Sequence, residues 1–213
     1  MEIAPGRLLA GRFRLVEQLG SGAMGEVWRA EHLMLRADVA VKLIDADVVT
    51  QPDAAMRFLR EARAAAALHS PHILQVFDFG VEDDVPYMVM ELLHGESLGE
   101  RLARVGRLSF ADAVRVITQV ARGIGKAHQA GIVHRDLKPD NVFLVRDGDE
   151  EFAKVLDFGI AKMTGAMLDT MSMERTSRGI VFGTPAYMSP EQTDAGEIDH
   201  RSDLWSLAVI AFE

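Results

Sequence analysis

The chain has 213 residues, of which 48% are hydrophobic and 26% are charged, with no cysteine and a formal net charge of −9. This composition is typical of a globular protein and excludes a disordered or fibrous one. The negative charge argues against nucleic acid or an anionic membrane as a partner, because either would require a basic surface. Without cysteine the chain can have neither disulfides nor cysteine-ligated metal sites. No stretch approaches the roughly 20 apolar residues of a membrane span, and residues 1–9 lack the apolar core of a signal peptide.

The first half of the chain shows the alternating pattern of a β-rich region. Strands are predicted at residues 13–20, 25–31, 38–44, 73–79 and 87–92. The first three should form an antiparallel meander. Between the third and the fourth, Thr50 and Asp53 flank Pro52 in a helix-start pattern, and the alanine-rich residues 54–68 should be helical.

After the last of these strands the hydrophobic period changes from two to 3.6, which predicts a helical second half. Ser109 and Asp112 mark a helix start, and Gly131 should end that helix. Its predicted apolar stripe consists of Val114, Ile117, Val120, Ala121, Ile124 and Ala127. Residues 163–179 are polar and lack periodicity, so we expect a long mobile loop there. Residues 206–213 form an apolar helical run, and we expect the natural protein to continue beyond it.

Two short segments carry a dense set of reactive groups. Residues 134–141 read His-Arg-Asp-Leu-Lys-Pro-Asp-Asn, and Asp157-Phe158-Gly159 begins sixteen residues after Asn141. Together they supply a carboxylate, an ammonium group, an amide and a second carboxylate. These groups can hold a metal-bound triphosphate while a carboxylate orients a hydroxyl toward it. Asp-Phe-Gly alone would indicate little, but its spacing from a complete eight-residue loop is specific.

A glycine-rich pattern of the form G-x-G-x-x-G-x-V occupies residues 20–27. Glycines at these places let a hairpin backbone approach phosphate oxygens without a Cβ in the way. Taken alone, the pattern fits an ordinary glycine-rich turn equally well. A dinucleotide-binding turn would require a helix to follow, whereas residues 26–30 continue as a strand.

A single lysine, Lys42, lies in an apolar strand, where a surface position would be its usual interpretation. Ala40 and Lys42 share one strand face, so the small alanine could lie over a base while the lysine reaches phosphates. Glu61 on the predicted helix is the candidate partner of Lys42. Considered alone, Glu61 would be a solvated helix residue beside Arg60 and Arg63.

Along residues 13–213 these motifs resemble, in order and spacing, the eukaryotic-type (Hanks-type) serine/threonine protein kinases of bacteria. The resemblance implies an α+β, two-lobed protein-kinase-like fold. A β-rich N-lobe with one main helix would span about 13–92, a hinge about 91–95, and a mostly helical C-lobe about 96–213. It also implies that the C-lobe is incomplete and that residues 1–12 are an N-terminal extension.

The resemblance assigns roles to the reactive residues of the two segments. Asp136 would accept or orient the proton of the substrate hydroxyl, and Lys138 would contact the γ-phosphate, as in serine/threonine-directed kinases. Asn141 and Asp157 would supply oxygens to magnesium. The implied catalytic set is Asp136, Lys138, Asn141, Lys42 and Glu61.

The resemblance also implies an ATP site. Kinases pair the strand lysine, here Lys42, with a glutamate of the following helix, here Glu61. Met90 would be the gatekeeper, with backbone groups of Glu91 and Leu93 meeting adenine. The implied ATP-binding residues are Leu19, Gly20, Ser21, Gly22, Ala23, Met24, Gly25, Val27, Ala40, Lys42, Met90, Glu91, Leu93 and Phe143.

An activation segment is implied between the metal-binding motif and residues 183–191. Arg135 beside the catalytic aspartate is typical of kinases with a phosphorylated activation loop, because a guanidinium binds phosphate bidentately. The candidate phosphorylation sites are Thr176 first, then Ser177, with Thr170 and Ser172 behind them. Thr184 would link Asp136 to Lys138 through its hydroxyl, and Asp203 would cap the backbone of the catalytic loop. Structural roles are implied for His134, Arg135, Phe158, Gly159, Thr184, Glu191 and Asp203.

The implied activity is transfer of the γ-phosphoryl group of ATP to serine and threonine hydroxyls of proteins, with Mg²⁺ or alternatively Mn²⁺ as the metal. The chain would also phosphorylate its own activation loop, and its role would be in signalling. Its partners would be protein substrates and a second copy for trans-autophosphorylation. Its location would be cytoplasmic for this piece, although bacterial relatives often carry a membrane span after the kinase domain. Two alternatives stay open. One is an inactive ATP-binding scaffold, although Lys42, Asp136 and Asp157 are all present. The other is a small-molecule phosphotransferase, which usually lacks the Pro190-Glu191 end of the segment.

Overall fold

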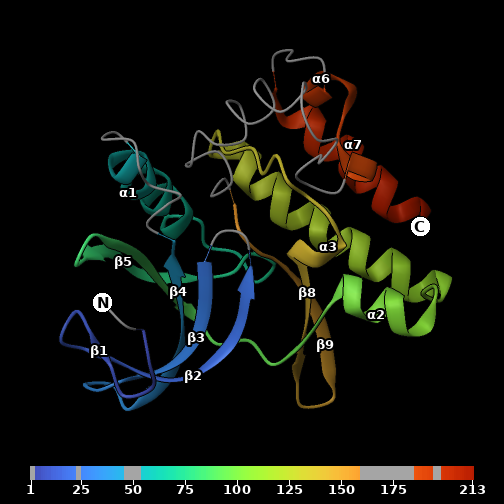
Figure 1. The fold of residues 1–213 in the computed structure, drawn as a ribbon. Helices are drawn as coiled ribbons and strands as arrows, with labels where there is room; N and C mark the ends of the chain where they lie inside the picture. Colours follow the sequence, from blue (N-terminus) through green and yellow to red (C-terminus); the bar gives the residue numbers. More distant parts are fainter. Residues whose placement is uncertain (1–2, 23–24, 46–53, 159–184, 194–197) are drawn as a thin grey trace, which may run out of the picture. The chain divides into compact units, whose positions relative to one another are not determined.

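The structure is a computed structural model that describes residues 3–22, 25–45, 54–158, 185–193 and 198–213 (Figure 1). The chain divides into two compact units. We call residues 1–67 together with 75–93 the N-terminal unit, and residues 68–74 together with 94–213 the C-terminal unit.

In its described residues, the N-terminal unit is built on a six-stranded antiparallel sheet with one helix (Figure 1). In their spatial order the strands are β1 (Leu8–Leu9), β2 (Phe13–Gly22), β3 (Gly25–His32), β4 (Ala37–Ile44), β6 (Val85–Glu91) and β5 (Val76–Glu82). The helix α1 (Ala54–Ala66) contacts β5. The predicted meander is present as β2, β3 and β4. Residues 1–12 contribute β1 to the same sheet.

One face of this sheet carries the core of the N-terminal unit. Val39, Val41 and Leu43 of β4 are buried there with apolar residues of the neighbouring strands. Successive residues of a strand point to opposite faces. The alternation therefore places Ala40 and Lys42 on the other face of the sheet.

The strand predicted at residues 73–79 is shifted in the structure. β5 begins only at Val76, while Ile73 forms a parallel bridge with Val155, both in the C-terminal unit. The N–H of Leu74 donates to the carbonyl of the same Val155 at 3.0 Å. Apolar residues on both sides of Gln75 can pair with either of two sheets, so the hydrophobic pattern could not divide the segment between them.

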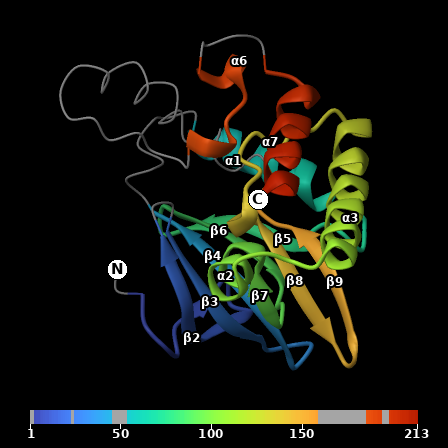
Figure 2. The ribbon, with the colours of Figure 1, turned by 90° about the vertical axis from the view of Figure 1, so that its right-hand side faces the viewer.

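The C-terminal unit combines helices with a small antiparallel sheet (Figure 2). The sheet consists of β7 (Gly95–Ser97), β8 (Val142–Asp147) and β9 (Glu150–Val155). The helices are α2 (Leu98–Val105), α3 (Phe110–Gln129), α6 (Pro190–Thr193) and α7 (His200–Phe212), with 3₁₀ turns η2 (Pro139–Asn141) and η4 (Pro185–Tyr187). α3 packs along β9, and α7 packs against α3. The predicted fold class is confirmed, but the small sheet and α2 were not predicted.

The predicted helix start at Ser109 is correct. Ser109 is the N-cap of α3, and its hydroxyl accepts the N–H of Asp112 at 3.2 Å. Gly131 follows the helix with a φ of 75°, the left-handed conformation that ends many helices. Both ends of α3 could therefore be predicted from local residues.

The predicted apolar stripe of α3 was partly wrong. Val114 and Ala121 are exposed, whereas Val116 and Gly123 are buried. A Cβ at Gly123 would lie only 2.6 Å from the carbonyl oxygen of His72. The buried face of α3 thus includes a close backbone approach at Gly123, which a pattern of hydrophobic side chains cannot reveal.

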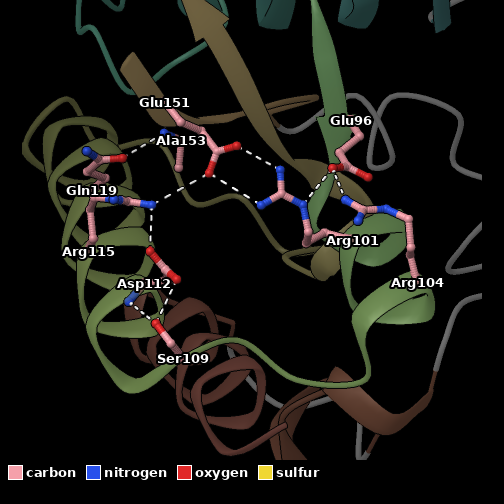
Figure 3. Close-up of polar contacts among 9 residues, drawn as sticks. All are labelled: Glu96, Arg101, Arg104, Ser109, Asp112, Arg115, Gln119, Glu151 and Ala153. Atoms are coloured by element: carbon pink, nitrogen blue, oxygen red, sulfur yellow. Dashed lines mark hydrogen bonds and ion pairs between the residues drawn. The ribbon is translucent and has the colours of Figure 1, made fainter. Parts of the chain in front are cut away.

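An ion-pair network joins α2, α3 and the small sheet (Figure 3). Arg101 of α2 binds Glu96 of β7 at 2.5 Å and Glu151 of β9 at 2.7 Å. Arg104 binds Glu96 at 2.6 Å, and Arg115 of α3 lies 3.6 Å from Glu151. Hydrogen bonds from Arg104 and Arg101 hold the pKa of the Glu96 carboxyl below its ordinary value. The network connects elements that are distant in the sequence.

Two predictions lie outside the described residues, namely the helix start at Thr50 and Asp53 and the polar region 163–179. Among the helices of the described ranges, none combines the length and the hydropathy that a membrane crossing requires.

Candidate active site

The glycine pattern lies at the hairpin between β2 and β3 of the N-terminal unit. Gly22 pairs with Gly25, and Gly20 pairs with Val27. Gly25 has a φ of 127°, and a Cβ there would lie 1.9 Å from the carbonyl oxygen of Leu43. A Cβ at Gly20 or Gly22 would meet no atom within 4 Å. Packing of the described residues therefore requires the third glycine but not the first two.

Three strands bring predicted ATP-binding residues to one face of the sheet. The register pairs Val27 of β3 with Lys42 of β4, and Ala40 of β4 with Met90 of β6. Directly paired residues share a sheet face. Lys42, Ala40 and Met90 are buried, and the Lys42 residue is only 8% exposed. This face lies opposite the core of the N-terminal unit.

The predicted adenine-binding backbone lies at the end of β6 and just beyond it. The N–H of Glu91 donates to the carbonyl of Gln75 at 3.1 Å, and the Glu91 carboxylate accepts the N–H of Gln75 at 2.7 Å. The N–H and C=O of Leu93 make no hydrogen bond within the described part of the chain. Gln75 thus fixes Glu91 at the end of the N-terminal unit.

Asp136 and its neighbours form one cluster in the C-terminal unit. The ammonium group of Lys138 lies 3.0 Å from Oδ2 of Asp136. Nδ2 of Asn141 donates to the same Oδ2 at 3.1 Å and to the backbone carbonyl of Asp136 at 2.7 Å. The carboxylate, about a fifth of whose side chain is exposed, is held from two sides and still reaches solvent.

The backbone before Asp136 is held by α7. Oδ1 and Oδ2 of Asp203 accept the N–H groups of Arg135 and His134, each at 2.8 Å. Arg135 has a φ of 69°, a conformation that costs free energy in a residue with a side chain. Asp203 is only 1% exposed, and it lies in the first turn of α7, where the helix dipole favours a negative charge.

His134 is a packing residue in the structure. It is fully buried, and its ring stacks edge-on against Phe158 with centroids 4.9 Å apart. Its Nε2 lies 2.7 Å from the carbonyl of Leu156, and its Nδ1 accepts the N–H of Asp136 at 3.3 Å. The ring therefore connects residues 134–136 to the segment that contains Leu156 and Phe158.

The β8–β9 hairpin places the two predicted metal residues at its open end. Val142 pairs with Val155, and the carbonyl of Asn141 accepts the N–H of Leu156 at 2.9 Å. Both hydrogen bonds of the Asn141 amide nitrogen go to Asp136, so its Oδ1 is turned away from that residue. An amide oxygen and the carboxylate of Asp157 are the kinds of ligand that Mg²⁺ prefers. The donor set therefore fits magnesium.

The serines of α7 hold two further segments. The Ser202 hydroxyl donates to Oε1 of Glu191 at 2.5 Å, and the Ser206 hydroxyl donates to the carbonyl of Tyr187 at 2.7 Å. The hydrogen bond from Ser202 holds the pKa of the Glu191 carboxyl below its ordinary value. Burial, with a hydrogen bond to Glu213, raises the pKa of Tyr187 to about 12. Helix α7 thus forms hydrogen bonds to residues 134–135, to α6 and to η4.

The other predicted site residues are placed as follows. Leu19 and Ser21 are exposed, and Leu93 and Phe143 are half-buried. Those outside the described residues are Ala23, Met24, Gly159, Thr170, Ser172, Thr176, Ser177, Thr184 and the side chain of Glu61.

Among the described residues around residues 134–141, His128 and Gln192 were not singled out in the sequence. Nε2 of His128 lies 2.7 Å from Asp203, and the side chain of Gln192 donates to the carbonyl of Arg135 at 2.7 Å. His128 lies in α3 with no motif around it. Gln192 directly follows Pro190-Glu191, and this adjacency was the only available signal.

Comparison with known proteins assigns the chain to a family. The family model of the protein kinase domain matches residues 13–213. The chain is 45% identical over 205 residues to the serine/threonine-protein kinase Pkn1 of Myxococcus xanthus, covering 95% of this chain and 28% of that protein. It is 39% identical over 213 residues to PknA of Mycobacterium tuberculosis, covering 98% of this chain and 47% of that protein.

The fold is also found in solved structures. The kinase domain of Mycobacterium tuberculosis PknI matches with a TM-score of 0.79 and 30% identity, covering 99% of this chain and 76% of that domain. The chain spans less than half of the length of Pkn1 and PknA. On its motifs, its fold and these matches, the chain belongs to the protein kinase domain family and is similar to the serine/threonine kinases of bacteria.

Proposed function

We propose that the chain is the catalytic domain of an ATP-dependent protein serine/threonine kinase, spanning residues 13–213. The observation that carries the proposal is the cluster in which Lys138 and Asn141 both contact the carboxylate of Asp136. A partly exposed carboxylate held in one orientation can direct a substrate hydroxyl, and an adjacent ammonium group can neutralise the transferred phosphoryl group.

In the proposed reaction, Asp136 orients the hydroxyl of a serine or threonine and accepts its proton. The hydroxyl oxygen forms a bond to the γ-phosphorus while the bond from that phosphorus to the β–γ bridging oxygen breaks, which releases ADP. Lys138 contacts the γ-phosphoryl oxygens. Asn141 Oδ1 and the Asp157 carboxylate would hold Mg²⁺, or Mn²⁺, which neutralises phosphate charge when bound.

In the proposed ATP site, the open backbone at Gly20 and Gly22 allows close approach of phosphates, because no described atom occupies the space of a Cβ there. Lys42 contacts the phosphates and pairs with Glu61. The base lies against Ala40 and hydrogen-bonds the backbone at the hinge. The complete proposed set also includes Leu19, Ser21, Ala23, Met24, Gly25, Val27, Met90, Glu91, Leu93 and Phe143.

Activation by phosphorylation of the chain's own loop is the second part of the proposal. Within the described residues, the buried Nε of Arg135 has no hydrogen-bond partner. A phosphate on Thr176, or else on Ser177 or Thr170, would supply an anion that a guanidinium binds bidentately. A second copy of the chain would be the substrate in this step, and other proteins would be substrates in signalling. We place the domain in the cytoplasm.

Incubation with Mg²⁺ and γ-labelled ATP, followed by mass spectrometry, tests the proposal. Wild type should label itself at Thr176, and Asp136→Asn should lower labelling at least 100-fold, because the hydroxyl loses its proton acceptor. Asp147→Asn, which changes an exposed carboxylate at the end of β8, is the control and should label normally. Unchanged labelling of Asp136→Asn would disprove the mechanism. ATP binding without labelling of wild type would favour the scaffold alternative.

A further inference from the structure

The peptide group that joins Arg135 to Asp136 is hydrogen-bonded at both its C=O and its N–H. Its carbonyl oxygen, on Arg135, accepts a hydrogen bond from Nε2 of Gln192 at 2.7 Å. Its N–H, on Asp136, donates to Nδ1 of His134 at 3.3 Å. The peptide unit is planar, so fixing both ends fixes the plane from which the Cα of Asp136 extends.

Gln192 is itself held in one orientation. Its Oε1 accepts the backbone N–H of Ser189 at 3.0 Å and the Ser189 hydroxyl at 3.1 Å. Ser189 is fully buried. Since Oε1 is occupied by two donors, Nε2 must be the atom that faces Arg135. The amide thus connects α6 to the carbonyl of Arg135, and hydrogen bonds at both its oxygen and its nitrogen fix its orientation.

The contact between Gln192 and the Arg135 carbonyl stabilises a backbone conformation that costs free energy. The φ of Arg135 is 69°, and its N–H is held by Asp203 from α7. That hydrogen bond holds the peptide group before Arg135, but it does not hold the carbonyl group of Arg135 itself. Gln192 secures the carbonyl, so the left-handed turn that directs Asp136 toward Lys138 and Asn141 is fixed on both sides.

We propose that Gln192 is a positioning residue that acts through the Arg135–Asp136 peptide on the carboxylate of Asp136. The proposal deepens the kinase function above and rests on it. Gln192 touches neither ATP nor the hydroxyl substrate, and it contributes by keeping Asp136 in its productive orientation. A small displacement of a group that orients a reactant can lower a rate by about 100-fold.

Two substitutions of Gln192 distinguish the role of its amide N–H donor from that of its amide oxygen. Gln192→Glu keeps an oxygen for Ser189 but replaces the donor to Arg135 with an acceptor, and Gln192→Leu removes both. Thr193→Val is the matched control, because Thr193 is an exposed neighbour on α6 whose hydroxyl, within the described residues, donates to the carbonyl of Pro190 at 2.7 Å. Both Gln192 variants should lower kcat about 10- to 100-fold with the KM for ATP within twofold, and the control should retain kcat within twofold.

A double substitution tests whether the effect passes through Asp136. Adding Gln192→Leu to Asp136→Asn should lower single-turnover phosphorylation less than twofold further, because residues that act as one unit are not additive. A full 10-fold additional loss, or a rise in KM in place of the fall in kcat, would mean that Gln192 does not act on this carboxylate.

Hydrogen exchange followed by mass spectrometry provides a readout that does not depend on activity. In Gln192→Leu the amides of residues 135–136 should exchange at least threefold faster than in wild type, while those of α7 are unchanged. A smaller increase overturns the inference. If the exchange result holds but wild type phosphorylates nothing, the proposed function fails while the positioning contact stands.

Discussion

Asp203 shows how one buried side chain can shape a loop. It accepts two backbone N–H groups of the loop and lies 2.7 Å from Nε2 of His128, all while 1% exposed. A carboxylate can accept all three bonds at once, and no neutral side chain of the same size can. The loop conformation, including the positive φ of Arg135, therefore depends on a charge at this position.

Asp203→Asn should lower the free energy of unfolding by about 3 kcal/mol, because the amide nitrogen would face a donor and leave a buried N–H unsatisfied. Urea unfolding monitored by circular dichroism measures the change. Asp149→Asn, in the exposed turn between β8 and β9, should change stability by less than about 0.5 kcal/mol. Equal stability of both variants would show that the Asp203 contacts contribute nothing net.

At the scale of elements, α2 is secured at its start and along one side. Ser97 and Glu100 form a reciprocal capping box, with the Ser97 hydroxyl accepting the N–H of Glu100 at 3.1 Å. Arg101 then ties the helix to both β7 and β9 (Figure 3). The side chain of Arg101 is 15% exposed, against 56% for Arg104, so water screens its ion pairs less.

Arg101→Met should therefore destabilise the protein by about 1–2 kcal/mol, since it leaves Glu96 and Glu151 without their shared cation. Arg104→Met, on the same helix and facing the same Glu96, should cost clearly less. Urea unfolding at low and high salt distinguishes them. If the loss in Arg101→Met arises from the ion pairs, it shrinks at 1 M salt, where the Debye length is about 3 Å. A loss independent of salt would point to the packing of the side chain instead.

Across the whole molecule, the residues proposed for catalysis belong to both units. Lys42 lies on the sheet face of the N-terminal unit opposite its core, whereas Asp136 and Asn141 lie in the C-terminal unit. Each unit has its own hydrophobic core. Activity should therefore require intact residues in each unit, while the folding of each unit should tolerate replacement of the reactive group in the other.

Lys42→Met should abolish at least 99% of autophosphorylation without a large change in melting temperature, because methionine preserves length and apolar packing on β4. Lys154→Met is the matched control. Lys154 is likewise a strand lysine only 8% exposed, on β9, and no catalytic role is proposed for it. The control should retain most of its labelling. Similar losses in both variants would indicate damage to packing instead of loss of a phosphate contact.

Some features of the fold could be predicted from local residues because their causes are local. The meander of β2 to β4 follows from alternation, and the ends of α3 follow from Ser109 and Gly131. Helix α2 was missed because eight residues give barely two turns of periodicity. The small sheet was missed because β8 and β9 are six residues each, and short apolar runs do not distinguish strand from helix.

The sequence by itself determined the family and the reactive groups. Residues 20–27, 134–141 and 157–159 are each a continuous stretch, so these motifs and the spacing between them can be read without a structure. Only the tertiary structure decided how the loop is held. Asp203 and Gln192 lie 67 and 56 residues after Asp136, and each acts on the loop through a backbone group. Backbone N–H and C=O groups are the same at every residue, so no sequence pattern can show which side chain will bind them.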